Sequence, residues 1–165
     1  LPFIADVFKS SEKEYPVLRS LIADDIPYDA KSSFSLYINH RDSYTGITDN
    51  DRSLTMKEFA LLCKQCLTDN IEKPIEELGK LFRSPGHVPI CRSSDKPLIN
   101  RFGHTELSTS LLTMARVTPV ACGCEMMGDD GKALSKKDAK RYADKHGLTF
   151  LEGKEIVKSW NSWSK

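Results

Sequence analysis

The sequence predicts an α+β fold in which helices flank a mixed sheet. Two observations lead to this class: short apolar or aromatic runs typical of strands alternate with stretches of helical spacing, and no repeat or low-complexity tract interrupts them. The chain has 165 residues, of which 39% are hydrophobic. That content is enough for one core, so we expect residues 1–165 to form a single domain.

The amino-terminal third is expected to contain a weak helix, a loop and a strand. Residues 3–21 show weak helical spacing, and Pro16 stands where a helix could begin. Residues 24–29 are interpreted as a polar loop. Residues 34–39 alternate between apolar and polar side chains and include aromatic residues, which is typical of a strand. Residues 45–52 are turn residues with Asp and Asn available as helix caps, and their hydroxyls and amides are equally suited to hold an anion.

The middle of the chain is expected to form two helices and a second strand. Helical spacing extends over residues 54–67, and a proline begins a shorter helix over residues 74–81. Residues 83–88 contain Pro and Gly and are interpreted as a loop. Residues 88–91 are apolar enough for a short strand.

The last third continues the alternation of helices and strands. Residues 105–115 have helical spacing, residues 119–124 are typical of a buried strand, and residues 128–131 predict a tight turn. Ser135 is expected to cap the next helix at its start, and Gly147 to end it. The remaining elements are a short strand over residues 148–151 and a terminal helix over residues 154–163.

Composition excludes several classes of partner. Lysine and arginine (24) nearly cancel aspartate and glutamate (23), and the net charge of +1 does not indicate a nucleic-acid or anionic-membrane partner. No apolar run approaches the roughly 20 residues of a membrane span, and the first residues do not resemble a signal peptide. We therefore expect a soluble, cytoplasmic protein whose partner is a small molecule.

The five cysteines are expected to be reduced thiols, since their number is odd and their spacing is not that of a small secreted domain. Cys63 and Cys66 have the two-residue gap of a zinc or redox pair. However, they lie within a helical pattern, and no second pair completes four ligands. We interpret them as structural, with a zinc module as a distant alternative.

One cluster of candidate functional residues precedes the helix over residues 105–115. Arg101, Gly103, His104 and Thr105 place a guanidinium, a ring, a hydroxyl and free backbone amides at one helix start. Charge, fork geometry and helix dipole would together suit a phosphate there.

Glu125 and His87 are the candidates for proton transfer. Glu125 follows His104 by 21 residues, an interval that suits a helix, a short connection and a strand, so that both side chains return to one edge of the fold. A carboxylate at the end of an apolar strand is either paired or has a raised pKa. His87, in a Pro-Gly-His loop, has a side chain suited to proton transfer near neutral pH.

Four motifs in register give the chain a resemblance to the 3,4-dihydroxy-2-butanone 4-phosphate synthase family, in its archaeal type. They are Thr45-Gly-Ile-Thr-Asp-Asn-Asp-Arg52, Arg83-Ser-Pro-Gly-His-Val88, Gly103-His-Thr-Glu106 and Cys124-Glu-Met-Met-Gly-Asp-Asp-Gly131. The resemblance runs from near Leu1 to about Trp160 and identifies the chain as the carboxy-terminal part of the synthase fold. It implies a lyase of riboflavin biosynthesis that converts D-ribulose 5-phosphate to L-3,4-dihydroxy-2-butanone 4-phosphate and formate, as a homodimer using Mg²⁺ or Mn²⁺.

The resemblance also implies roles for individual residues. His104 resembles the metal ligand and a substrate contact. Arg101, Gly103 and Thr105 resemble substrate and phosphate contacts, and Glu125 resembles the acid or base at the substrate. His87 and Thr45 resemble further active-site groups. An imidazole ligand is easier for Mn²⁺ than for Mg²⁺, so both metals stay open.

The chain departs from the family pattern at its start, where the acidic, arginine-bearing loop has no counterpart. Because hard divalent ions need several oxygen ligands, we expect the 165-residue stretch to be inactive alone. Two alternatives stay open at this point. One is a non-catalytic binding or assembly module with the same fold, and the other is a different phosphosugar enzyme on the same scaffold.

Overall fold

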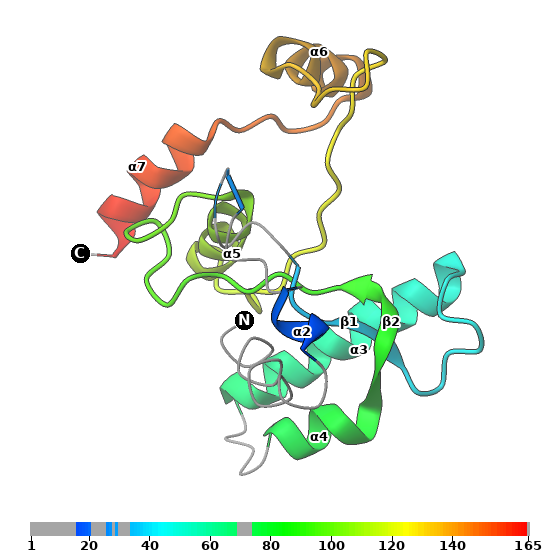
Figure 1. The fold of residues 1–165 in the computed structure, drawn as a ribbon. Coiled ribbons are helices and arrows are strands. Elements are labelled where there is room, and N and C mark those ends of the chain that lie inside the picture. The colour runs from blue at the N-terminus through cyan, green and yellow to red at the C-terminus, as the bar shows by residue number, and fades with distance from the viewer. Residues whose placement is uncertain (1–15, 21–25, 28, 30–33, 69–73, 165) are drawn as a thin grey trace. The chain divides into compact units, whose positions relative to one another are not determined.

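The computed structural model describes residues 16–20, 26, 27, 29, 34–68 and 74–164 (Figure 1). The chain divides into two compact units, Leu1–Arg92 and Ser93–Lys165. Most of the weak helix expected over residues 3–21 and of the loop over residues 24–29 lies outside the described residues. The short helix α2, Val17–Ser20, begins directly after Pro16, as predicted.

A two-stranded antiparallel sheet organises the first unit (Figure 1). Its strands are β1, Tyr37–His40, and β2, Phe82–Pro89, and two helices pack against them, α3, Asp49–Thr68, and α4, Pro74–Leu81. The helix predicted over residues 74–81 is confirmed at both ends. The α+β class is also confirmed, although the sheet among the described residues is antiparallel rather than mixed.

The core of this unit is built from Ile38, Leu62 and Phe82, one residue from each of β1, α3 and β2. The rings of Phe59 and Phe82 meet edge to face at a centroid distance of 6.0 Å. Full burial of each such apolar side chain contributes about 1.5–3 kcal/mol. Cys66 packs against the same cluster, which agrees with a structural role for this thiol.

The strands pair around a bulge of four residues. Ile38 lies opposite Val88, whereas the next residue, Asn39, lies opposite Arg83, so residues 84–87 have no partner residue on β1. The loop predicted over residues 83–88 is therefore wrong, because the Pro and Gly that suggested it form this bulge within β2. The second strand correspondingly begins at Phe82 instead of Val88 and ends at Pro89.

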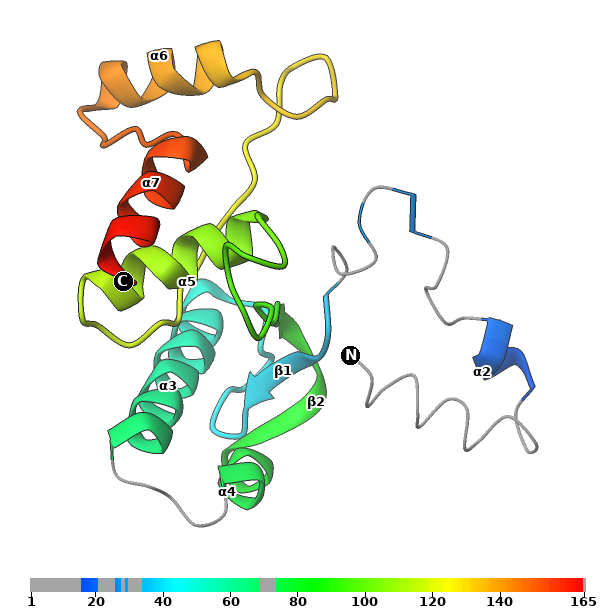
Figure 2. The ribbon, with the colours of Figure 1, turned by 90° about the vertical axis from the view of Figure 1, so that its left-hand side faces the viewer.

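The second unit contains three helices, α5, His104–Met114, α6, Lys136–His146, and α7, Gly153–Trp163. Helices α5 and α7 pack against each other (Figure 2). A side chain at Gly153 would place its Cβ 3.1 Å from Leu107 Cδ1, so the start of α7 lies directly on α5. The helices predicted over residues 105–115 and 154–163 are confirmed to within one residue at each end.

The caps predicted for α6 are confirmed. Ser135 accepts the backbone N–H of Asp138 at 3.2 Å. Gly147 ends the helix with φ of 62°, the left-handed conformation that glycine adopts without strain. The predicted turn over residues 128–131 is also present, closed by a 3.0 Å hydrogen bond from the Gly131 N–H to the Gly128 carbonyl.

The strands predicted over residues 119–124 and 148–151 do not form among the described residues. Residues 121–127 are instead exposed and extended, and Leu148 and Leu151 are exposed as well. A strand needs a neighbour to satisfy its backbone N–H and C=O groups, and no described strand lies beside either segment. None of the described helices is both long enough and apolar enough to cross a membrane.

Candidate functional site

The predicted site residues fall in both units. Thr45 and His87 belong to the first unit, and Arg101, Gly103, His104, Thr105 and Glu125 belong to the second.

In the first unit, His87 is held by the side chain of Asn39. The Asn39 Oδ1 atom accepts the His87 backbone N–H at 2.8 Å, and the Asn39 Nδ2 atom lies 3.1 Å from Nδ1 of the His87 ring. Asn39 is buried, with 5% of its surface exposed, while His87 is exposed. The His87 ring is thus exposed to solvent on the bulge in β2, while its backbone and Nδ1 are held by Asn39. The sequence alone indicates no role for Asn39.

The loop that contains Thr45 is wrapped around the carboxylate of Asp51. This carboxylate accepts the backbone N–H groups of Tyr44, Thr45 and Gly46, the last at 2.8 Å, and the Thr45 hydroxyl at 3.2 Å. The hydrogen bond from the Gly46 N–H has the largest effect and lowers the pKa of Asp51. Burial comes second and raises it, and the hydrogen bonds from Tyr44 and Thr45 lower it further, so the pKa lies below its ordinary value.

This arrangement favours the structural interpretation of residues 45–52. The backbone N–H groups of Thr45 and Gly46 are bound to Asp51 and are therefore not offered to an anion. The cap residue itself is neither Asp nor Asn, because the Thr48 hydroxyl accepts the Asp51 N–H at 3.2 Å. Thr45 is exposed beside the carboxylate, and its role as an active-site group stays a prediction.

In the second unit, His104 is the first residue of α5 and is exposed. The N-cap is Gly103, which supplies no side chain to cap the helix. The first backbone N–H groups of a helix have no partner within the helix, and the helix dipole makes this end attractive to anions. His104 and Thr105 therefore lie where a phosphate group would be favoured, as the sequence indicates.

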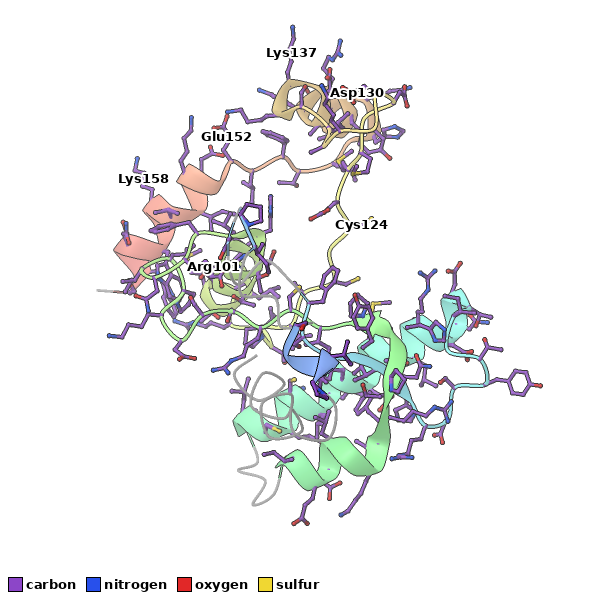
Figure 3. The ribbon with its side chains drawn as sticks, in the orientation of Figure 1. Arg101, Cys124, Asp130, Lys137, Glu152 and Lys158 are labelled. Atoms are coloured by element: carbon purple, nitrogen blue, oxygen red, sulfur yellow. The ribbon has the colours of Figure 1, made fainter. Side chains whose placement is uncertain are left out.

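Arg101 is anchored by a carboxylate that sequence reasoning missed. Its Nη1 atom lies 2.5 Å from Oε2 of Glu106, whose side chain is fully buried, while 14% of the Arg101 side chain is exposed. The other Glu106 oxygen accepts the Ser94 backbone N–H at 2.8 Å. Glu106 therefore joins the loop before α5 to the helix and fixes the guanidinium near the helix start. Figure 3 shows Arg101 beside α5.

The glycine at 103 is needed for this contact. A Cβ atom there would lie 2.6 Å from Nη1 of Arg101, closer than real Cβ contacts allow. The signal for Glu106 was present in the sequence as Gly-His-Thr-Glu. Apolar spacing alone does not reveal its burial, because Leu111 is 39% exposed whereas Glu106 and Ser110, one turn apart, are buried.

Glu125 follows Cys124 on the extended stretch that leads toward α6 (Figure 3). It is exposed, and its carboxylate makes no hydrogen bond or ion pair with any described residue. The predicted convergence of Glu125 with His104 depends on the strand over residues 119–124, which is absent from the described residues. The convergence therefore stays a prediction.

The described residues do not by themselves fit a divalent metal ion. They include no group of three or more His, Cys, Asp or Glu side chains arranged to hold one. His104 alone supplies one nitrogen, whereas Mg²⁺ and Mn²⁺ prefer several oxygen ligands in octahedral geometry. Burial raises the pKa of the Cys63 thiol, and the neighbouring Cys66 raises it further, which disfavours the thiolate that zinc requires.

Within the second unit, an imidazole and a guanidinium lie at the start of α5, an arrangement typical of the class of proteins that bind small anionic substrates. Comparison with known proteins identifies the member of this class. The family model of 3,4-dihydroxy-2-butanone 4-phosphate synthase matches residues 14–159, and the chain belongs to this family of riboflavin-biosynthesis lyases.

Relatives from two archaea show how far the match extends. A synthase of Methanothermobacter thermautotrophicus is 46% identical over 161 residues, which cover 97% of this chain and 67% of the relative. A synthase of Archaeoglobus fulgidus is 42% identical over 165 residues, which cover 99% of this chain and 68% of the relative. The chain thus spans about two thirds of the length of these relatives.

A solved structure shares the fold. The 3,4-dihydroxy-2-butanone 4-phosphate synthase of Candida albicans superposes with a TM-score of 0.63 at 26% sequence identity, over 86% of this chain and 66% of that one. The relatives cited are named as the enzyme, so they lend no support to a non-catalytic module.

Proposed function

We propose that the protein carrying this chain converts D-ribulose 5-phosphate to L-3,4-dihydroxy-2-butanone 4-phosphate and formate. The observation that carries the proposal is the family match over residues 14–159, a range that includes every candidate site residue. The similarity to the Methanothermobacter synthase covers 97% of the chain and supports the same reaction.

The residues of the chain suit the first step of this reaction, which removes a proton from carbon and forms an enediol. Glu125 is exposed and bears a carboxylate suited to act as the acid or base. His87 offers a ring nitrogen to a substrate oxygen from the bulge in β2. Both groups then move protons in the later dehydration and rearrangement, where water must be controlled.

The second group of residues suits the phosphate of the substrate. The Arg101 guanidinium, held by Glu106, and the start of α5 at His104 and Thr105 provide positive charge and backbone donors. We include Gly103 because its missing side chain lets Arg101 approach the helix start.

The requirement for Mg²⁺ or Mn²⁺ belongs to the proposal, with His104 as one ligand. The described residues do not complete such a site, so the remaining ligands must come from elsewhere and no step is derived through the ion. We also propose a homodimer and a cytoplasmic location. Both follow from the family rather than from a contact in this chain.

Formate release from D-ribulose 5-phosphate tests the proposal. The variants are made in the longer form, in which this chain is joined to the part of the Methanothermobacter synthase that the match leaves out. There, Glu125→Gln and His104→Ala should each lower kcat by at least about a hundredfold, the scale of a lost acid–base or positioning group. Asp129→Asn is the matched control, because this exposed carboxylate lies close by in the turn over residues 128–131 and should leave the rate unchanged. Equal rates for Glu125→Gln and Asp129→Asn would contradict the assignment.

A comparison of two protein forms shows whether a lack of activity reflects a wrong assignment or an incomplete active site. The 165-residue chain is assayed beside the same chain joined to the part of the Methanothermobacter synthase that the match leaves out. Formate release by the joined form alone supports the proposal and also the expected inactivity of the shorter stretch. Release by neither form, with both folded and metal supplied, overturns the proposal.

A further inference from the structure

The carboxamide of Asn39 makes two hydrogen bonds with His87, one to its backbone and one to its ring. Together they determine which ring nitrogen of the neutral His87 carries the proton. We propose that Asn39 is a positioning residue that holds the neutral His87 ring with its proton on Nε2. The sequence assigns His87 to the active site but gives no role to Asn39. The proposal rests on the proposed function only where it concerns turnover.

The orientation of the amide follows from the backbone. The His87 N–H is a donor and lies 2.8 Å from the Asn39 side chain, so the atom that receives it must be the carboxamide oxygen. The amide nitrogen of Asn39 is therefore the atom 3.1 Å from Nδ1 of the ring. An NH₂ group only donates, so Nδ1 must accept and the proton of the neutral ring resides on Nε2.

The position of Asn39 is fixed by its surroundings. The residue is in β1, opposite Arg83, and only 5% of its surface is exposed. Gly46 packs against the amide, and a Cβ there would lie 2.0 Å from Nδ2. Gly46 has φ of +84°, a conformation that favours glycine. Rotation of the amide would place its NH₂ group against the His87 N–H, two donors facing each other.

The consequence is a defined donor on the exposed side of the ring. With Nδ1 occupied by Asn39, the Nε2–H bond is the group that His87 offers to a ligand. Such a donor suits an oxygen that gains negative charge during enediol formation. An aspartate at this position would instead accept from Nδ1–H and leave a lone pair on Nε2, so the neutral amide determines which function the ring has.

Long-range ¹H–¹⁵N NMR of the ring nitrogens tests the proposal without substrate. The chain contains four histidines, and His87→Gln assigns the His87 signals. At a pH about two units above the ordinary histidine pKa of about 6.5, His87 should show a pure Nε2–H tautomer. A mixture like that of free imidazole, or a proton on Nδ1, would overturn the proposal.

Substitution at Asn39 provides the second arm. Asn39→Asp keeps the size and the acceptor for the His87 N–H, and it should move the proton of the neutral ring to Nδ1. Asn161→Asp, at an exposed position of α7, adds the same charge and should leave the His87 tautomer unchanged. An unchanged tautomer in folded Asn39→Asp would contradict the positioning role.

Turnover links the tautomer to catalysis. In the form that releases formate, Asn39→Asp should lower kcat at least tenfold with little change in KM, whereas Asn161→Asp should match the parent. A shifted tautomer with unchanged kcat would overturn the catalytic part of the inference. Absence of formate release by any form would count against the proposed function. The tautomer of His87, measured without substrate, would still test the positioning role of Asn39 independently.

Discussion

Single buried polar residues determine the local geometry in both units. Asn39, Thr55 and Glu106 are each buried and each satisfied by at least two hydrogen bonds. Burying such groups without partners would cost free energy, and with partners they specify one arrangement. Their effect is to hold His87, the start of α3 and Arg101 in place.

Glu106→Gln should destabilise the second unit by about 2–4 kcal/mol, because it leaves Arg101 in a mostly buried site facing an amide donor. Denaturant unfolding followed by circular dichroism measures this free energy. Glu125→Gln is the control, since this glutamate is exposed and its replacement should stay within about 0.5 kcal/mol of the parent. Equal stability of the two variants would show that the buried ion pair does not hold the loop.

Two buried hydroxyls should respond in opposite ways when removed. The Thr55 hydroxyl accepts the His40 N–H and donates to the Asp51 carbonyl, both at 2.9 Å, so Thr55→Val should cost about 1–3 kcal/mol. The Ser110 hydroxyl is buried and has no partner among the described residues, so Ser110→Ala should be neutral or stabilising. Thermal unfolding of both variants checks the contrast, which fails if Ser110→Ala is the more destabilising change.

At the scale of elements, the periodicity of the sequence predicted helices better than strands. The bounds of α4 and the caps of α6 follow from local residues such as Pro74, Ser135 and Gly147. Strands depend on a neighbour, so the apolar run over residues 119–124 does not suffice to form one. The bulge in β2 was missed because Pro85 and Gly86 are typical of loops as well as of bulges.

The loop before α3 should respond to pH through Asp51. The pKa of this carboxyl is lowered in the folded chain, chiefly by the Gly46 N–H, so its contribution to stability is present above the ordinary value of 3.8. As pH falls through the lower folded pKa, that contribution is lost. The difference in unfolding free energy between parent and Asp51→Ala should therefore shrink in acid.

Asp49→Ala is the comparison for this pH series. Asp49 is also in the first turn of α3, but its partner is the exposed side chain of Arg52. A surface ion pair contributes little, so its removal should give a small difference at every pH. An Asp51 effect that stays constant with pH would indicate that the loop is held by other contacts.

The C-terminal cap of α6 gives a separate test of element stability. Gly147→Ala should destabilise the helix by about 1 kcal/mol, because alanine adopts the left-handed conformation at φ of 62° with strain. Hydrogen exchange of the α6 amides measures the change locally. Faster exchange confined to α6 is expected, and unchanged protection would contradict the importance of this cap.

At the scale of the whole molecule, the sequence predicts the family and the helices, but not how the site is assembled. Family motifs identify Thr45, His87, His104 and Glu125 as residues of interest. Their supporting residues, Asn39, Asp51 and Glu106, became visible only through hydrogen bonds between segments far apart or one turn apart in the chain. Such partners depend on tertiary packing, which local spacing does not encode.

The fate of uniformly ¹³C-labelled D-ribulose 5-phosphate tests the central claim most directly. The measurement uses the longer form, which adds to this chain the part that its relatives carry beyond it. After incubation of this form with the substrate and a divalent metal, ¹³C NMR should show formate and a four-carbon phosphate in equal amounts. Conversion to a five-carbon isomer without formate, or unchanged substrate in the presence of folded protein, would contradict the assignment as a synthase.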